Sequence, residues 1–257
     1  MKKWQIILVV FIILVISVFV FNFHKQEETT SLSVAAAANL TKSFSDIGNA
    51  FTEETGIPLS FVFGSTGQLT QQIKNGAPVD LFAAADTISI EILAEEKLID
   101  KETIKNYALG NIVLVPYDQG DYLAKSLADL THPQIKIIAL ANPETAPYGK
   151  AAQELLQTAG IWDEVKEKIV FGKNIDEVLT YVKTGNADAA LVAKSLVYQT
   201  ETKYYEDQSW LSLYRPIVQA LGVMENSKNK DAAIRFAQFI LSKKGQKILQ
   251  DYGYETP

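Results

Sequence analysis

Residues 57–67 read Ile57-Pro58-Leu59-Ser60-Phe61-Val62-Phe63-Gly64-Ser65-Thr66-Gly67 and carry the chain from a strand-like run into a helix-like one. Up to Phe63, apolar side chains occupy every second position, which is the period of a half-buried strand. Leu69 and Ile73 follow at helical spacing, and Asn75-Gly76 ends the predicted helix. Such a junction directs N–H groups, two hydroxyls and a helix dipole to one place, which favours an anion. An ordinary turn with a Ser/Thr N-cap explains the same residues.

The composition excludes several classes of protein. The chain has 257 residues, 47% of them hydrophobic and 21% charged, a balance typical of globular proteins. A net charge of -6 argues against nucleic acid as a partner. The absence of Cys excludes thiol catalysis, zinc–thiolate sites and disulfides, and two His residues provide little for a metal centre or a Ser-His hydrolase.

The N-terminus predicts a membrane anchor. Two lysines precede residues 4–23, whose only polar members are Gln5, Ser17 and Asn22. Twenty helical residues span about 30 Å, the thickness of the hydrocarbon layer of a bilayer. The lysines favour a cytoplasmic N-terminus, which places the following chain outside. A cleaved signal peptide is the alternative, although the end of the run lacks the small residues that signal peptidase prefers.

The remaining chain alternates between strand-like and helix-like segments. The predicted strands span residues 32–38, 57–63, 79–86, 111–115, 134–140, 168–171, 187–193 and 217–223. A helical stripe follows most of them, and one long helix is predicted from Asp231 past Leu249. Strands that alternate with helices of about 10–15 residues indicate an α/β fold with mostly parallel sheets.

Four strand-to-helix junctions carry groups that favour an anion. They are Asn39, which we predict to be a helix N-cap, Ser65-Thr66, Tyr148-Gly149 and Asn174-Ile175. In open α/β sheets ligands bind at the carboxyl ends of the strands, where all four junctions lie. Two junctions fall in each half of the chain, so we expect helix starts from two lobes to converge on a ligand between them.

Five sequence blocks occur in a characteristic order and spacing. They are Ala36-Ala37-Ala38-Asn39-Leu40, Phe63-Gly64-Ser65-Thr66-Gly67, Gly76-Ala77-Pro78-Val79-Asp80-Leu81-Phe82, Asn142-Pro143-Glu144-Thr145-Ala146-Pro147-Tyr148-Gly149 and Gly185-Asn186-Ala187-Asp188-Ala189-Ala190. Together they resemble the molybdate-binding proteins of molybdate ABC importers, which are type II extracellular solute-binding proteins. The resemblance runs from about Leu32 to Tyr254.

The resemblance implies a two-lobed, periplasmic-binding-protein-like fold, preceded by one transmembrane helix. Each lobe is a mixed or mostly parallel sheet flanked by helices. We expect the signal anchor and a linker in residues 1–31, lobe 1 in residues 32–112 and 217–257, and lobe 2 in residues 113–216.

The same resemblance implies the binding residues. A tetrahedral dianion lies between the lobes and accepts hydrogen bonds from neutral groups. Asn39 falls where the family commonly has Ser or Asn, and Thr66 falls at the second hydroxyl of a Gly-Ser-Ser-Gly-like turn, with Ser65 as a further candidate. Tyr148 and Ile175 fall where backbone N–H groups of the second lobe reach the oxyanion. We expect the ring of Tyr148 to pack at the lobe rim.

One position departs from the family pattern. The family's usual ligand tyrosine aligns with Ala193, which has no hydroxyl. Either Lys194, Ser195 or Tyr198 supplies the missing donor, or the site has one hydrogen bond fewer. A hydrogen bond to a charged acceptor is worth about 1.5–3 kcal/mol, so its loss weakens binding about ten- to hundredfold. We assign structural roles to Asp80, Asp86 and Asp188, because carboxylates that face an oxyanion repel it.

The sequence thus predicts a protein on the outer face of the cytoplasmic membrane, or a secreted one if the signal is cleaved. The resemblance implies that it captures molybdate or tungstate and delivers the ligand to the permease of an ABC importer. We expect a monomer without enzymatic activity, cofactor, metal centre or nucleic-acid partner. The alternatives are a binding protein or sensor for another oxyanion such as sulfate, and an enzyme that acts on phosphorylated or sulfated substrates. No nucleophile–base pair or metal-ligand cluster in the sequence supports the enzyme.

N-terminal sequencing of the native protein tests the anchor. We expect the mature chain to begin at or next to Met1. A mature chain that begins near Ser31 would instead show that the hydrophobic run is a cleaved signal peptide.

Overall fold

The computed structural model of the protein describes residues 31–120 and 122–257. The anchor that we predict in residues 4–23 lies outside this part of the chain. Among the described residues, no helix combines the length and apolar character needed to cross a membrane.

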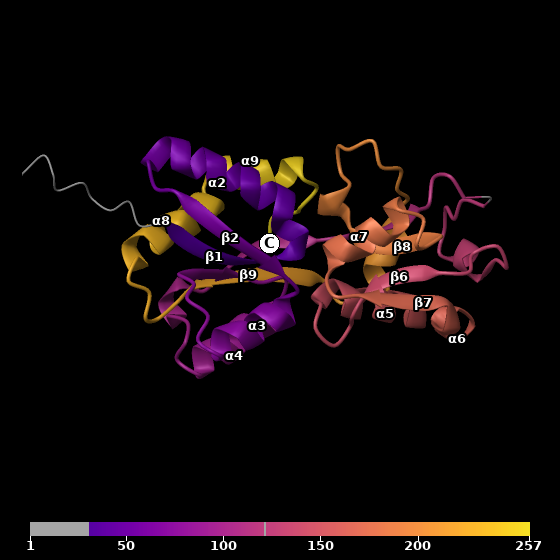
Figure 1. Cartoon of the computed structure of the whole chain (residues 1–257), viewed down its shortest axis with the longest axis horizontal. Coiled ribbons are helices and arrows are strands. Elements are labelled where there is room, and N and C mark those ends of the chain that lie inside the picture. Colours follow the sequence, from indigo (N-terminus) through magenta and orange to yellow (C-terminus); the bar gives the residue numbers. More distant parts are fainter. Residues whose placement is uncertain (1–30, 121) are drawn as a thin grey trace, which may run out of the picture. The chain divides into compact units, whose positions relative to one another are not determined.

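Five strands form the first sheet of the described chain. Their order is β2 (Leu59–Gly64), β1 (Leu32–Ala37), β3 (Leu81–Ala83), β9 (Ile217–Val223) and β4 (Lys105–Gly110). Figure 1 labels β1, β2 and β9. β1 is parallel to β2 and β3, whereas β9 is antiparallel to β3 and β4. Helices cover both faces of this sheet, so the interior strand β1 is buried almost throughout, which explains its run of small apolar residues. The edge strand β2 keeps the alternating pattern instead.

Four strands form the second sheet in the described residues. Their order is β5 (Ile112–Pro116), β8 (Ala189–Ala193), β6 (Ile138–Ala141) and β7 (Ile169–Gly172). β6 is parallel to β7 and β8, whereas β5 is antiparallel to β8. Both sheets are therefore mixed. The predicted α/β class, with two sheets flanked by helices, is confirmed.

Three helices begin at or next to predicted junctions, at Thr66, Pro147 and Ile175. The first sheet is flanked by α2 (Thr41–Thr55), α3 (Thr66–Lys74), α4 (Ile88–Glu95), α8 (Lys230–Leu241) and α9 (Lys243–Asp251). The second is flanked by α5 (Pro147–Thr158), α6 (Trp162–Val165) and α7 (Ile175–Lys183). Single 3₁₀ turns include η1 (Ala38–Leu40), η2 (Lys101–Thr103), η3 (Ala128–Thr131), η4 (Lys166–Lys168), η5 (Lys194–Leu196) and η6 (Gln208–Ser212). Gly56 ends α2 at a left-handed φ of 73°, as its position predicts.

The single long helix predicted at the C-terminus is wrong, because α8 and α9 are separate helices. Ser242 adopts an extended conformation between them and caps α9, where its Oγ accepts a hydrogen bond from Gly245 N at 3.2 Å. Gly245 allows the tight turn, since a Cβ there would lie 2.2 Å from the carbonyl oxygen of Phe239. Both helices have apolar faces, so the hydrophobic pattern alone does not reveal the break.

Three further differences concern strands. The strand predicted at residues 79–86 is limited to Leu81–Ala83, and the strand predicted at residues 134–140 begins only at Ile138. The strand Lys105–Gly110 was not predicted. The strand Lys105–Gly110 begins with two exposed polar residues, lies at the sheet edge and contains an irregularity between Asn106 and Ala108. An edge strand with this sequence lacks the apolar alternation on which the prediction depends.

Aromatic side chains fill the space between α2 and α8. Phe236 of α8 packs edge-on against Phe51 at a ring distance of 5.1 Å and against Phe44 at 6.2 Å. Phe239 contacts Phe51 at 5.6 Å. These contacts hold a C-terminal helix against the first helix that follows β1, so the two ends of the described chain share one core.

Gly149 provides a test of how closely α5 packs on β6. A Cβ at this position would lie 2.2 Å from the carbonyl oxygen of Ala141, so we expect Gly149→Ala to lower the unfolding free energy by about 3 kcal/mol. Gly160→Ala is the matched control, because Gly160 has a φ of +76° and no neighbouring atom within 4 Å. It should cost only about 1 kcal/mol. Urea denaturation measures both, and equal losses would contradict the close packing.

Candidate functional site

The four predicted binding residues all lie just beyond the carboxyl ends of strands. Asn39 and Thr66 follow β1 and β2 of the first sheet, whereas Tyr148 and Ile175 follow β6 and β7 of the second. All four residues are 1–4% exposed. The carboxyl ends of strands are where α/β proteins bind their ligands, so the location fits the predicted role.

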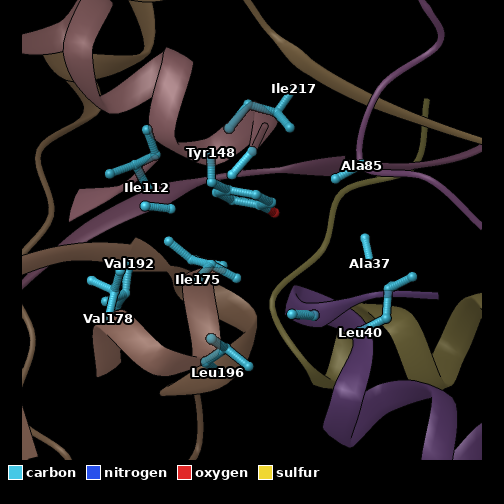
Figure 2. Packing of buried hydrophobic residues seen from close by; sticks show 14 of the residues in the cluster. Ala37, Leu40, Ala85, Ile112, Tyr148, Ile175, Val178, Val192, Leu196 and Ile217 are labelled. Carbon is cyan, nitrogen blue, oxygen red and sulfur yellow. The ribbon is translucent and has the colours of Figure 1, made fainter. Parts of the chain in front are cut away.

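Hydrogen bonds join the elements that carry these residues. Ser195 Oγ in η5 donates to the carbonyl oxygen of Asn39 at 2.9 Å. Gly67 N in α3 donates to the carbonyl oxygen of Thr145 at 2.8 Å. η1 also contacts α7. Figure 2 shows Tyr148 and Ile175 facing the segments that carry Ala37, Leu40 and Ala85. The structure therefore brings helix starts from the two sheets together.

Asn39 is not the helix N-cap that we predicted. It lies inside η1, whose N-cap is Ala37, and α2 begins after Leu40 without a side-chain cap. Both amide hydrogens of Asn39 are used elsewhere, since Nδ2 donates to Gln219 Oε1 and to Tyr254 Oη, each at 2.8 Å. These partners lie 180 and 215 residues away in sequence, so no local pattern reveals them. The donor that Asn39 offers to a ligand is thus its backbone N–H.

Ser65 and Thr66 have different roles. Ser65 caps α3, and its Oγ accepts a hydrogen bond from Gln68 N at 3.4 Å. The Thr66 hydroxyl accepts from Ala85 N at 3.0 Å, which leaves its own hydrogen free to be donated. The geometry therefore favours Thr66 over Ser65 as a ligand-binding hydroxyl.

The ring of Tyr148 does not pack at a rim, as we expected, because the residue is only 2% exposed. Its hydroxyl accepts a hydrogen bond from Gln219 Nε2 at 3.2 Å. Burial raises the pKa of this phenol well above its usual range, so it stays neutral. Since Pro147 opens α5 and has no N–H, Tyr148 provides the first backbone donor of that helix.

Ile175 is the first residue of α7. Its neighbour Asn174 caps the helix, with Oδ1 accepting from the N–H groups of Asp176 at 3.0 Å and Glu177 at 2.9 Å. The N–H of Ile175 precedes these two and is not reached by the cap. Asn174 is the N-cap that the sequence predicts, and Ile175 is the donor that it leaves available.

The first N–H groups of a helix have no partner within the helix. In the described part of the chain, no protein acceptor takes the N–H of Asn39, Thr66, Tyr148 or Ile175. Buried N–H groups of this kind need an acceptor. Two come from each sheet, and together with the Thr66 hydroxyl they form a set of neutral donors that suits an oxyanion.

Ala193 ends β8 and is fully buried. Of its three candidate substitutes, Lys194 pairs with Glu206 at 2.9 Å, and its Nζ lies 5.3 Å from the ring centre of Tyr198. Ser195 is different, because it is 4% exposed and its hydroxyl lies against Asn39. Ser195 is thus the neighbour whose side chain reaches a predicted binding residue, and its hydroxyl hydrogen is donated to the carbonyl oxygen of Asn39.

Sequence reasoning missed a buried polar group beside the site. Gln219 Oε1 accepts from Asn39 Nδ2 at 2.8 Å and from Tyr107 Oη at 3.1 Å. Tyr254 Oη donates to the carbonyl oxygen of Asn39 at 2.8 Å. One signal was available, since Gln219 is the only polar side chain in the strand IVQALGV, where a buried amide needs several partners.

A cavity of about 530 Å³ begins next to the helix starts. Gly67 and Pro147, which adjoin Thr66 and Tyr148, are part of its wall, but the four predicted binding residues are not. Asp86 also lines it, and burial raises the pKa of this carboxyl. The wall of the cavity thus includes the chain neighbours of Thr66 and Tyr148 but no neighbour of Asn39 or Ile175.

Asp80 and Asp188, the other two acidic residues to which we assigned structural roles, accept hydrogen bonds from backbone and neutral side-chain groups. Asp80 accepts from Ser33 N at 2.8 Å and Ser227 Oγ at 2.7 Å. Asp188 accepts from the N–H groups of residues 136 and 137. Across residues 31–120 and 122–257, no group of three His, Cys, Asp or Glu side chains is arranged to hold a metal ion.

Replacement of Thr66 should affect the ligand-free protein. Thr66→Val keeps the shape but leaves the buried N–H of Ala85 without its acceptor, so we expect a loss of about 1–3 kcal/mol in unfolding free energy. Thr66→Ser keeps the hydroxyl and serves as the control, with a much smaller loss. Chemical denaturation of the ligand-free variants measures both, and an unchanged Thr66→Val protein would refute the contact.

Comparisons with known proteins identify the family of the chain. The family model described as bacterial extracellular solute-binding protein matches residues 32–255. The molybdate-binding protein ModA of Rhodobacter capsulatus is 34% identical over 228 residues, which cover 86% of this chain and 87% of that protein. The periplasmic molybdate-binding protein of Azotobacter vinelandii gives a TM-score of 0.81 at 28% identity and covers 88% of this chain and 100% of its own.

A second solved structure extends the agreement. The substrate binding domain of a putative molybdenum ABC transporter from Clostridium difficile gives a TM-score of 0.67 at 35% identity, with 88% of this chain and 99% of that chain covered. The family resemblance in the sequence blocks is thereby confirmed. From Leu32 almost to its C-terminus, the chain belongs to the bacterial extracellular solute-binding protein family.

Proposed function

We propose that the protein captures molybdate outside the cytoplasmic membrane and delivers it to the permease of an ABC importer, with tungstate as a second ligand. The names of the Rhodobacter and Azotobacter relatives support molybdate. The Clostridium structure, described as part of a putative molybdenum ABC transporter, supports the permease as partner.

The observation that carries the proposal is the set of buried N–H donors at Asn39, Thr66, Tyr148 and Ile175. Removal of a dianion from water is costly unless several prearranged groups replace the water at once. Backbone N–H groups at helix starts meet this need without a formal charge, because their positions are fixed by the fold. An acidic protein with a net charge of -6 can bind an anion in this way.

The mechanism that we propose is closure of two lobes around the ligand, without chemistry. Lobe 1 comprises residues 32–112 and 217–257, and lobe 2 comprises residues 113–216. Hydrogen bonds between these segments support the closure of the lobes. Ser195 Oγ donates to the carbonyl oxygen of Asn39, and Lys42 Nζ donates to the carbonyl oxygen of Leu196 at 2.7 Å. A ligand that bridges both lobes stabilises the closed form, which the permease recognises.

Selectivity follows from the kind of donor. Phosphate keeps a proton near neutral pH, and a site made only of donors provides no acceptor for that proton. Sulfate is fully ionised, so its rejection depends on cavity size instead. The Thr66 hydroxyl and the helix-start N–H groups therefore favour a large, fully ionised tetrahedral anion.

The remaining parts of the proposal concern the protein's place and form. We propose that residues 1–31 contain an uncleaved anchor that keeps a monomer at the outer face of the membrane. We also propose that it has no enzymatic activity, since the family is one of solute-binding proteins. A membrane-tethered sensor for an oxyanion uses the same site and differs only in the absence of a permease partner.

Isothermal titration tests the ligand. Molybdate and tungstate should each release or absorb heat with one site per chain, whereas sulfate and phosphate should bind at least about a hundredfold more weakly. Tight binding of sulfate alone would replace molybdate by sulfate in the proposal. No heat with any of the four anions would refute an oxyanion-binding role.

Replacement of Ser195 tests what substitutes for the family tyrosine. Ser195→Ala should weaken molybdate binding by about tenfold, because the hydrogen bond with which Ser195 Oγ holds the carbonyl group of Asn39 is lost. Lys194→Met and Tyr198→Phe are the matched controls and should leave the affinity nearly unchanged, since Lys194 pairs with Glu206. A larger loss in Lys194→Met than in Ser195→Ala would assign the donor to the lysine.

A further inference from the structure

We propose that Gln219 is a positioning residue that couples the two sides of the oxyanion site through a chain of side-chain hydrogen bonds. The proposal rests on the function proposed above, because the coupling acts on ligand affinity. Gln219 itself does not touch the ligand. It holds Asn39 of the first sheet and Tyr148 of the second sheet in a fixed relation.

The chain of hydrogen bonds is continuous from one end to the other. Asn39 Nδ2 donates to Tyr254 Oη at 2.8 Å and to Gln219 Oε1 at 2.8 Å. Gln219 Nε2 then donates to Tyr148 Oη at 3.2 Å. Tyr254 lies near the C-terminus, Asn39 follows β1, Gln219 lies in β9 and Tyr148 lies in α5. Four segments that are distant in sequence thus meet through four side chains.

Burial makes this arrangement costly to disturb. Gln219 is 0% exposed, Asn39 is 1%, Tyr148 is 2% and Tyr254 is 4%. Water cannot replace a lost partner at such positions, so a broken bond leaves a buried polar group unsatisfied. Burial also raises the pKa of Tyr254 to about 12, so the chain consists of neutral groups at physiological pH.

Gly110 provides independent evidence that the Gln219–Tyr148 contact is built into the fold. A Cβ at this position would lie 2.0 Å from Tyr148 Oη and 2.7 Å from Gln219 Nε2. Any side chain there would therefore separate the two groups. Gly110 has no left-handed conformation that requires glycine, so the close approach of these two side chains explains the residue.

The coupling follows from the two binding residues that this series of hydrogen bonds connects. Asn39 and Tyr148 are the residues whose backbone N–H groups we assign to the ligand, and their side chains are held by the same amide. A shift of one side chain is passed through Gln219 to the other. The donors of the two sheets are then aligned together. Loss of a hydrogen bond at one end of the series therefore lowers the ligand affinity, and a second loss at the other end lowers it little further.

A double-mutant cycle between Tyr148→Phe and Tyr254→Phe tests this. Each variant removes one hydroxyl and keeps the ring and the backbone N–H. Each should weaken molybdate binding by about tenfold, and the double variant by about tenfold to thirtyfold rather than the hundredfold that independent effects give. In a Gln219→Leu background the series of hydrogen bonds is already interrupted, so Tyr148→Phe should weaken molybdate binding by less than about twofold more.

Tyr252→Phe is the matched control. Its hydroxyl donates to Asp46 at 2.6 Å outside the buried chain, so this variant should keep the wild-type affinity. Losses that multiply in the double variant, or unchanged affinity in both single variants, would overturn the coupling. A role in stability alone would lower the melting temperature of both variants without producing the non-additive loss of affinity.

Hydrogen exchange in the ligand-free protein separates this proposal from the proposed function. Gln219→Leu should increase exchange at the amides of residues 38–41 and of residues 148–150 together, compared with the wild type. Faster exchange at one segment only would overturn the coupling. If the wild type gives no heat with any oxyanion, the proposed function fails, and coupled exchange would then still show that Gln219 links the two helix starts.

Discussion

A primary amide that is completely buried in an apolar strand must satisfy both of its polar ends inside the protein. Gln219 does so through Asn39 and Tyr107 at its oxygen and Tyr148 at its nitrogen. These partners fix much of what surrounds them. They require a glycine at position 110, draw the C-terminal Tyr254 against Asn39, and set the start of α5 beside the first sheet. The buried polar groups beside the candidate site are thus held by neutral hydrogen bonds.

In the proposed site, use of backbone N–H groups makes binding independent of the chemistry of the side chains. The donor that we assign to Ile175 belongs to a residue with an apolar side chain, and the one that we assign to Tyr148 belongs to a residue whose ring is packed in the core. Such a site tolerates substitutions that a site built from side chains would not. The donors depend instead on where each helix begins, and Pro147 and Asn174 fix those positions for α5 and α7.

Local signals in the sequence were sufficient for most of the fold. Gly56 ended α2, Ser65 began α3 and Asn174 began α7, because each of these residues acts on its own few neighbours. The prediction failed where the decisive partner was distant. Asn39 has the chemistry of an N-cap, but its amide is taken by Gln219 and Tyr254, and nothing near it in the chain indicates this.

The site could be predicted to a similar extent. The order of the sequence blocks located all four junctions, and the structure places them at strand ends that meet. The burial of the Tyr148 ring and the position of Ser195 against Asn39 depend on tertiary packing, so they required the structure. Gln219 could be predicted in part. The sequence shows a single polar residue in an apolar strand, but it does not show which groups that residue bonds.

The position of β9 has a consequence for how the chain acquires its structure during synthesis and export. β9 lies between β3 and β4, so the first sheet is incomplete until residues 217–223 have emerged. The second sheet is built from the continuous stretch 112–193 and needs no later residues. Pairing of distant segments is slow because a long loop must close first. The second sheet is thus able to form before the first is complete. Strands β1, β2 and β3 pair with one another early, whereas β4 has no strand partner until β9 has emerged.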